Sequence, residues 1–214
     1  MEAKEIQIKT LIISIASIIV IEVVHFVALS KGLSYPLVIL GAARLLEIVL
    51  IMLVFMIWGK GLSSIGLGLD TMALGLKRGL IWSVCFGIVA SFALLMLTVL
   101  GINPLQLIRA HLPSRPGEII LFFFIGGMVG PIAEEVFFRG VLYGFLRRWG
   151  VVVALVVSTL VFVLIHPLKS GFPVTQAVGG IVFALAYEMG GSLVVPITIH
   201  ALGNIAIFTL SLLY

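Results

Sequence analysis

Long apolar runs dominate this 214-residue sequence and leave few folds open to it. Hydrophobic residues make up 62% of the chain and charged residues only 10%. In a soluble domain roughly a quarter of the residues are charged and under half are apolar. Runs of about 20 apolar residues are long enough to cross a bilayer as helices. The sequence therefore predicts an all-α fold, a polytopic transmembrane helical bundle of about seven spans.

The predicted spans follow one another along the whole chain. They cover about residues 8–29, 35–58, 79–100, 118–148, 151–166, 174–189 and 193–213. The segment 59–71 is rich in Gly and Ser and is predicted to be a loop with one interfacial turn, and the proline-containing segment 101–117 is predicted to lie on the membrane surface. The first run has no clear small-x-small cleavage site before Lys31, so we expect a retained helix.

The distribution of Lys and Arg favours an orientation with the N-terminus inside. This orientation places seven basic residues inside and four outside: Lys4, Lys9, Lys60, Lys77, Arg78, Arg147 and Arg148 against Lys31, Arg109, Arg115 and Lys169. We therefore expect a multi-pass integral protein of a prokaryotic cell membrane with a cytoplasmic N-terminus. The net charge of +4 comes from these short loops, so we expect the lipid bilayer and no nucleic acid as a partner. Cys85 is the single cysteine, which excludes an intrachain disulfide.

Two adjacent carboxylates and a guanidinium lie in the middle of the fourth apolar run. They are Glu134, Glu135 and Arg139. A charged side chain at the centre of a membrane helix costs about 2.5 to 3.5 kcal/mol on insertion scales, so three of them together indicate a function. Because glycines precede Pro131, we expect the helix to kink or restart there, with both glutamates in a first turn near the positive end of the helix dipole.

Later spans carry further polar residues at depths that overlap with Glu134. At about 1.5 Å per residue, Glu134 lies roughly 16 Å from the shared loop side, His200 about 12 Å, Asn204 about 18 Å and His166 about 22 Å. These side chains can therefore meet in one intramembrane polar cavity. Glu22 and His25, and likewise Arg44 and Glu47, are spaced i and i+3 on the first two spans, and we expect these pairs to face the bundle interior.

The residue types in this set match the needs of peptide hydrolysis. Glu134 can take a proton from water and pass it to a leaving amine, and His166 can help to polarise that water. His200 and Asn204 are one turn apart and can both donate hydrogen bonds to one oxyanion. Glu135 and Arg139 are spaced i and i+4, so Arg139 is expected to pair with Glu135 and fix the helix.

At these residues the chain resembles the CPBP family of intramembrane glutamic endopeptidases, the CAAX-protease and bacteriocin-processing family. Three family motifs occur in order: E-E-x-x-x-R from Glu134 to Arg139, F-x-x-x-H from Phe162 to His166, and H-x-x-x-N from His200 to Asn204. The resemblance covers 118–214, which is predicted to be the catalytic core, with 1–117 as the scaffold.

The resemblance implies a helical bundle with a water-filled cavity open to one side of the membrane. Glu134 would activate water with help from His166, His200 and Asn204 would form the oxyanion site, and no covalent intermediate or cofactor would be needed. The eukaryotic branch of the family trims prenylated tails, but this sequence indicates only a peptide or a membrane-anchored protein as substrate. The oligomeric state is open.

Two alternatives use the same residues. One Glu and two His are a known catalytic zinc set, which makes a zinc-dependent membrane peptidase an alternative, although the sequence has no H-E-x-x-H. The other is a non-enzymatic membrane partner or a proton-coupled transporter with Glu134 and the histidines as a relay.

Overall fold

The computed structural model describes residues 6–166 and 173–213, and these residues form helices and no strand. The all-α prediction is therefore confirmed. Five helical stretches in the described residues are long and apolar enough to cross a membrane: Ile8–Ser30, Pro36–Ile57, Leu62–Val99, Pro116–Trp149 and Val194–Leu213. The other two predicted spans form shorter apolar helices, Val151–Leu164 and Val174–Gly190.

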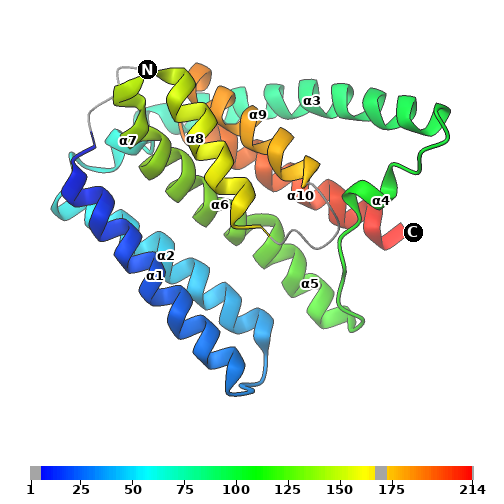
Figure 1. Ribbon diagram of the computed structural model, residues 1–214, viewed down its shortest axis with the longest axis horizontal. Helices are drawn as coiled ribbons and strands as arrows, with labels where there is room; N and C mark the ends of the chain where they lie inside the picture. Colours follow the sequence, from blue (N-terminus) through cyan, green and yellow to red (C-terminus); the bar gives the residue numbers. More distant parts are fainter. Residues whose placement is uncertain (1–5, 167–172, 214) are drawn as a thin grey trace.

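Helices α1 (Ile8–Ser30) and α2 (Pro36–Ile57) form an antiparallel hairpin that leans on one side of the remaining bundle (Figure 1). Pro36 begins α2, a position where its fixed φ is favourable and no N–H is required. Helix α2 contacts α6, one of the segments of the central helix. The hairpin predicted to be scaffold therefore lies next to the segment that carries Glu134.

Helix α3 (Leu69–Val99) begins ten residues earlier than predicted, after a short 3₁₀ turn at Leu62–Ile65. A glycine-rich sequence is typical of a loop, but the glycines of this region allow close helix packing. A Cβ at Gly75 would lie 2.6 Å from Ser192 Oγ, and one at Gly79 would lie 2.7 Å from Thr198 Cβ. Helix α3 therefore packs closely on α10. Lys77 and Arg78 were counted as loop residues, but both lie within α3.

The central helix runs from α5 (Pro116–Phe124) through α6 (Gly130–Glu135) and α7 (Gly144–Leu146) to a final 3₁₀ turn. The predicted restart at Pro131 is wrong, because Val129 and Gly130 keep right-handed helical dihedrals and the helix continues. Two π-helical segments, Ile125–Val129 and Val136–Tyr143, flank α6 instead. Wider turns of this kind accommodate an irregular helix without breaking it, and they occur frequently at functional sites.

Helices α8 (Val151–Leu164), α9 (Val174–Gly190) and α10 (Val194–Leu213) complete the bundle around the central helix (Figure 1). Glu188 at the end of α9 accepts hydrogen bonds from Arg147 and from the Tyr143 hydroxyl, which joins α9 to the end of the central helix. Two residues used in the predictions, Lys4 and Lys169, lie outside the described residues.

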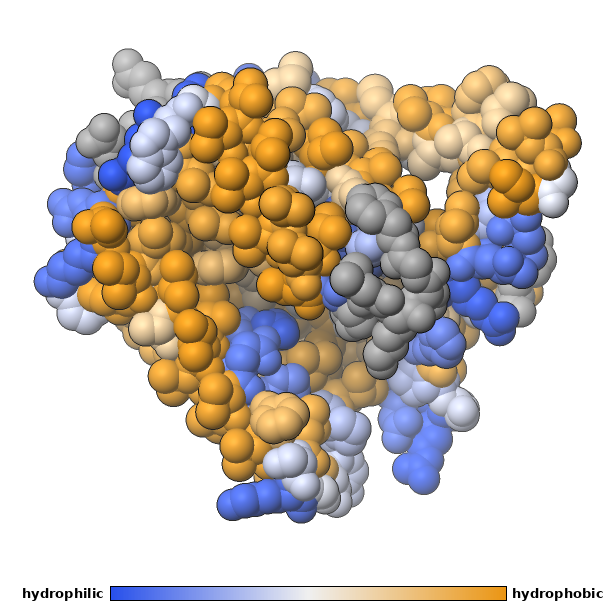
Figure 2. All heavy atoms as spheres, in the orientation of Figure 1, coloured by the Kyte–Doolittle hydropathy of each residue, from blue (hydrophilic) through white to orange (hydrophobic). Residues whose placement is uncertain are grey.

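Apolar side chains cover much of the outer surface (Figure 2). Large examples are Phe26 on α1 and Phe92 on α3, whose exposed fractions are 72% and 62%. Water would oppose such exposure, whereas the hydrocarbon core of a bilayer accepts it. The surface is therefore that of an integral, multi-pass membrane protein.

Candidate active site

Helix α6 brings Glu134 to the histidines of two other helices. Glu134 Oε2 lies 3.8 Å from His200 Nε2 and 4.0 Å from His166 Nε2. Both distances exceed those of direct hydrogen bonds, and Glu134 Oε2 has no hydrogen-bond partner among the described residues. The side chains of Glu134 and His166 remain 27% and 22% exposed. The arrangement is thus a carboxylate between two imidazoles, with a buried Oε2 on side chains that are otherwise partly exposed.

The neighbouring Glu135 has a different environment, because its side chain is completely buried. Its Oε1 accepts a hydrogen bond from Arg139 Nη1 at 3.0 Å and another from His200 Nδ1 at 2.7 Å. The predicted pair between Glu135 and Arg139 is therefore present. Since an ionised carboxylate has no hydrogen to donate, Nδ1 is the donor, and this contact fixes the His200 ring with Nε2 toward Glu134.

Arg139 is fully buried among aromatic rings and backbone. Its Nη2 donates to the carbonyl of Gly180 at 3.2 Å, and its guanidinium lies 4.7 Å from the ring centre of Phe162 and 5.3 Å from that of Phe183. Rings at these distances attract a cation through their negative faces. A buried guanidinium without such partners would be costly, so these contacts hold Glu135 and Arg139 in place.

His166 is oriented by the backbone of its own helix end. Its Nδ1 donates to the carbonyl of Phe162 at 2.6 Å, since a carbonyl oxygen can only accept. In the neutral ring Nε2 is then an acceptor, and it faces Glu134. The spacing of four residues between Phe162 and His166 therefore has a local reason: it places this carbonyl beside the ring.

Asn204 replaces a backbone hydrogen bond that the central helix lacks. Its Nδ2 donates to the carbonyl of Gly126 at 2.8 Å. In a π-helical turn this carbonyl would accept the N–H five residues later, which belongs to Pro131 and does not exist. One hydrogen of the Asn204 amide is thus used on backbone, and the second remains available to the site.

We expect that replacing Asn204 by leucine lowers the free energy of unfolding by about 1 to 3 kcal/mol, because the partly buried Gly126 carbonyl loses its donor. Reversible unfolding in mixed detergent micelles measures this change. Thr209→Val is the matched control on the same helix, since the Thr209 hydroxyl is exposed and donates to its own helix at the carbonyl of Ile205. Equal stabilities of the two variants would show that Asn204 does not support the π-helical turn.

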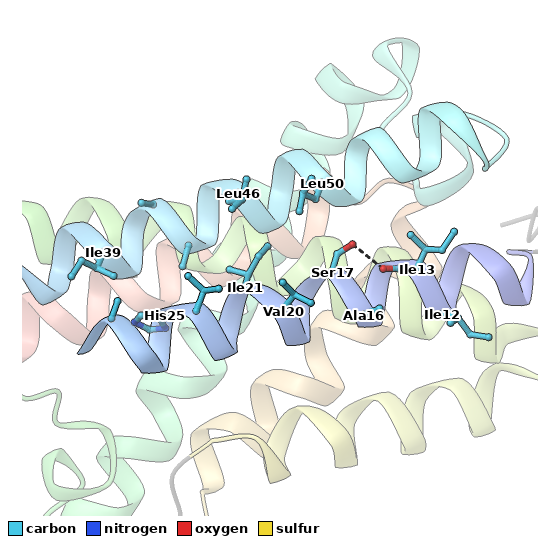
Figure 3. A pocket seen from close by; sticks show the side chains of 14 residues that line it. Ile12, Ile13, Ala16, Ser17, Val20, Ile21, His25, Ile39, Leu46 and Leu50 are labelled. Carbon is cyan, nitrogen blue, oxygen red and sulfur yellow. Dashed lines mark hydrogen bonds between the residues drawn. The ribbon is translucent and has the colours of Figure 1, made fainter. Parts of the chain in front are cut away.

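A cavity of about 660 Å³ lies elsewhere, between α1 and α2 (Figure 3). Its walls are mostly apolar, with side chains such as Ile39, Leu46 and Leu50 beside His25, and the hydroxyl of the lining residue Ser17 donates to the carbonyl of Ile13. None of the predicted site residues lines this cavity. It is therefore separate from the polar cavity predicted around Glu134.

Three contributors to the site were not predicted from the sequence. Phe183 stacks on the His200 ring at 4.5 Å with an interplanar angle of 19°, Gly180 supplies a carbonyl to Arg139, and Gly126 supplies one to Asn204. The glycine pairs within the apolar runs were the available signal, because glycine permits close approach to backbone. A Cβ at Gly180 would lie 2.8 Å from Thr159 Cγ2.

Comparisons with known proteins identify the same part of the chain. Residues 116–206 match the model of the family described as type II CAAX prenyl endopeptidase Rce1-like, which covers less than half of the 214 residues. These residues are therefore similar to a family of membrane endopeptidases.

One curated relative is the membrane-embedded CAAX protease MroQ of Staphylococcus aureus strain USA300. It is 37% identical over 94 residues, which cover 41% of this chain and 38% of the relative. The chain thus matches well under half of that relative's length. No solved structure matches the chain significantly.

Proposed function

We propose that this protein is an intramembrane endopeptidase in which Glu134 activates the hydrolytic water. The observation that carries the proposal is the position of Glu134, whose unpartnered Oε2 lies within 4.0 Å of both His166 Nε2 and His200 Nε2. A water at this place can donate one hydrogen to Glu134 and the other to the acceptor nitrogen of His166. The family match of residues 116–206 supports an endopeptidase activity in general.

In the first step Glu134 takes a proton from water while the water oxygen attacks the peptide carbonyl carbon. The oxyanion that forms receives a hydrogen bond from the second N–H of Asn204. His200 can donate from Nε2 only as the imidazolium, because Nδ1 already donates to Glu135. Glu134 then gives its proton to the amine nitrogen as the C–N bond breaks. No atom of the protein becomes bonded to the substrate.

The ion pair between Glu135 and Arg139 supports this mechanism by orienting His200. Glu135 Oε1 accepts from both partners, so movement of Arg139 would also move the imidazole. We therefore assign Glu135, Arg139 and Phe162 a positioning role, and Glu134, His166, His200 and Asn204 a catalytic role.

The proposed substrate is a peptide or a membrane-anchored protein, cut without a cofactor. We also propose that the N-terminus is cytoplasmic in a prokaryotic membrane. Within the described residues, no group of three or more His, Cys, Asp and Glu side chains is arranged to hold a metal ion. Cleavage after chelation tests the zinc-peptidase alternative. The presence or absence of new peptide fragments in the membrane tests the transporter or partner alternative.

Mass spectrometry of membrane peptides tests the proposed activity. Cells that make the wild-type protein are compared with cells that make Glu134→Gln at the same level. The proposal expects fragments with one defined new terminus in the first cells and none in the second. Identical peptide sets from the two cells would contradict an endopeptidase and favour the transporter or partner role.

A further inference from the structure

A second group of ionisable side chains joins α1 to α2 within the membrane-spanning region. Arg44 donates from Nη2 to Glu22 Oε1 and from Nη1 to Glu47 Oε2, both at 2.6 Å. His25 Nδ1 lies 3.1 Å from Glu22 Oε2. The two predicted pairs are therefore present, and Arg44 unites them into one cluster, here called the hairpin cluster.

The hairpin cluster has more carboxylates than cations. With a neutral His25 it contains two carboxylates and one guanidinium, so it carries one excess negative charge. Such a charge is costly between membrane helices unless something compensates it. The Glu22 side chain is 38% exposed, so the excess charge can be reached from outside.

Glu47 provides an independent sign of a ligand. The residue is only 3% exposed, and its Oε1 is buried with no hydrogen-bond partner among the described residues. The other oxygen is held by Arg44, which fixes the direction of the carboxylate. A buried carboxylate oxygen without a donor is unfavourable. A donor from outside the hairpin would therefore be bound here.

The hairpin cluster lies beside the candidate active site. Helix α2, which carries Arg44 and Glu47, contacts α6, which carries Glu134. Figure 2 shows hydrophilic side chains at the edge of a hollow between the α1–α2 hairpin and the remaining bundle. A peptide placed against Glu134 would thus pass the hairpin cluster.

We propose that the hairpin cluster is a substrate subsite that takes a positively charged group, the side chain of Lys or Arg, near the scissile bond. Glu22 and Glu47 supply the negative charge, and the unpartnered Oε1 of Glu47 accepts a hydrogen bond from the cation. Arg44 holds the two carboxylates in place and is itself occupied by them. The proposal rests on the proposed peptidase function, because it assigns a specificity to that site.

Binding to the inactive Glu134→Gln protein in detergent micelles tests the subsite without requiring cleavage. The probes are two short, fluorescent, apolar peptides that differ at one central residue, lysine in one and norleucine in the other. We expect the lysine peptide to bind about tenfold more tightly, as for one charge-assisted hydrogen bond. Adding Glu22→Gln is expected to abolish this preference. Adding Glu118→Gln, a change at an exposed carboxylate of the same type, is expected to leave it.

Glu47→Gln is the second variant, and its thermal unfolding is recorded to establish that it folds. Equal affinities for the two peptides, or a lysine preference that survives Glu22→Gln, would overturn the subsite. Cleavage of cellular peptides without a basic preference would leave the peptidase intact and remove the subsite. A lysine preference in binding with no cleavage by the wild-type protein would support the subsite and contradict the peptidase function.

Discussion

Replacing Glu134 by glutamine is expected to lower peptide cleavage by about 10²- to 10⁴-fold, the range that a positioned general base contributes. Glutamine keeps the shape of the side chain but cannot take a proton from water. The folded state should be retained, because Glu134 is partly exposed and its Oε2 makes no hydrogen bond with the described residues. The measurement is kcat/KM on a peptide substrate identified by the mass spectrometry of membrane peptides, together with thermal unfolding of the variant.

The matched control for this variant is Glu118→Gln on the same continuous helix. Glu118 is exposed and, within residues 6–166 and 173–213, pairs only with Arg115, at 3.5 Å, so its removal should leave cleavage unchanged. Wild-type cleavage by the Glu134 variant would contradict its role as the base. Loss of folding in that variant, with cleavage falling only in proportion to the folded protein, would contradict it as well.

Replacing Arg139 by methionine is expected to lower the free energy of unfolding by about 3 to 5 kcal/mol. The reason is that the fully buried carboxylate of Glu135 keeps its charge and loses its partner. Methionine retains much of the apolar volume, so the change measures the charge more than the packing. Reversible unfolding in mixed micelles provides the value.

Two further variants distinguish the loss of the Glu135–Arg139 ion pair from a general effect of replacing an arginine on stability. Arg115→Met removes a guanidinium that is 83% exposed, and no measurable change in stability is expected. The double variant Glu135→Leu with Arg139→Met removes both buried charges, so it should be more stable than Arg139→Met alone. A double variant that is less stable would contradict the importance of the unpaired carboxylate.

Much of the fold and of the site chemistry follows from spacing along helices. The apolar runs predicted a membrane helical bundle, and the spacing of four residues predicted the contact of Glu135 with Arg139. Depth along the helices was enough to bring Glu134 near His166 and His200, since a helix rises by a constant amount per residue.

The errors arose where glycine and proline have two structural meanings. Gly75 and Gly79 lie before and at the predicted start of the third span, residue 79. Both belong to α3, where they allow this helix to lie against α10. Pro131 read as the start of a new helix, yet the helix continues through it. Its missing N–H is accommodated by a π-helical turn and by the amide of Asn204. The sequence does not predict which remote side chain donates a hydrogen bond to a backbone carbonyl that lacks its helical partner.

Other parts of the site depend on contacts between segments far apart in sequence. The stacking of Phe183 on His200 is set by how α9 packs against α10, and the place of Glu47 is set by how α2 packs against α6. Helical spacing reports only neighbours on one helix. Glu47 was therefore predicted as an interior polar residue, and the packing of its helix α2 against α6, which carries Glu134, required the structure.

Cleavage after prolonged chelation tests the central claim most directly, because it asks whether Glu134 and water suffice. Purified wild-type protein and Glu134→Gln are placed in lipid vesicles, treated with a strong chelator, and given the same peptide. The account predicts an undiminished rate and one defined new terminus with the wild-type protein, and no product above background with the variant. Loss of wild-type cleavage on chelation and its return with added zinc would contradict the account.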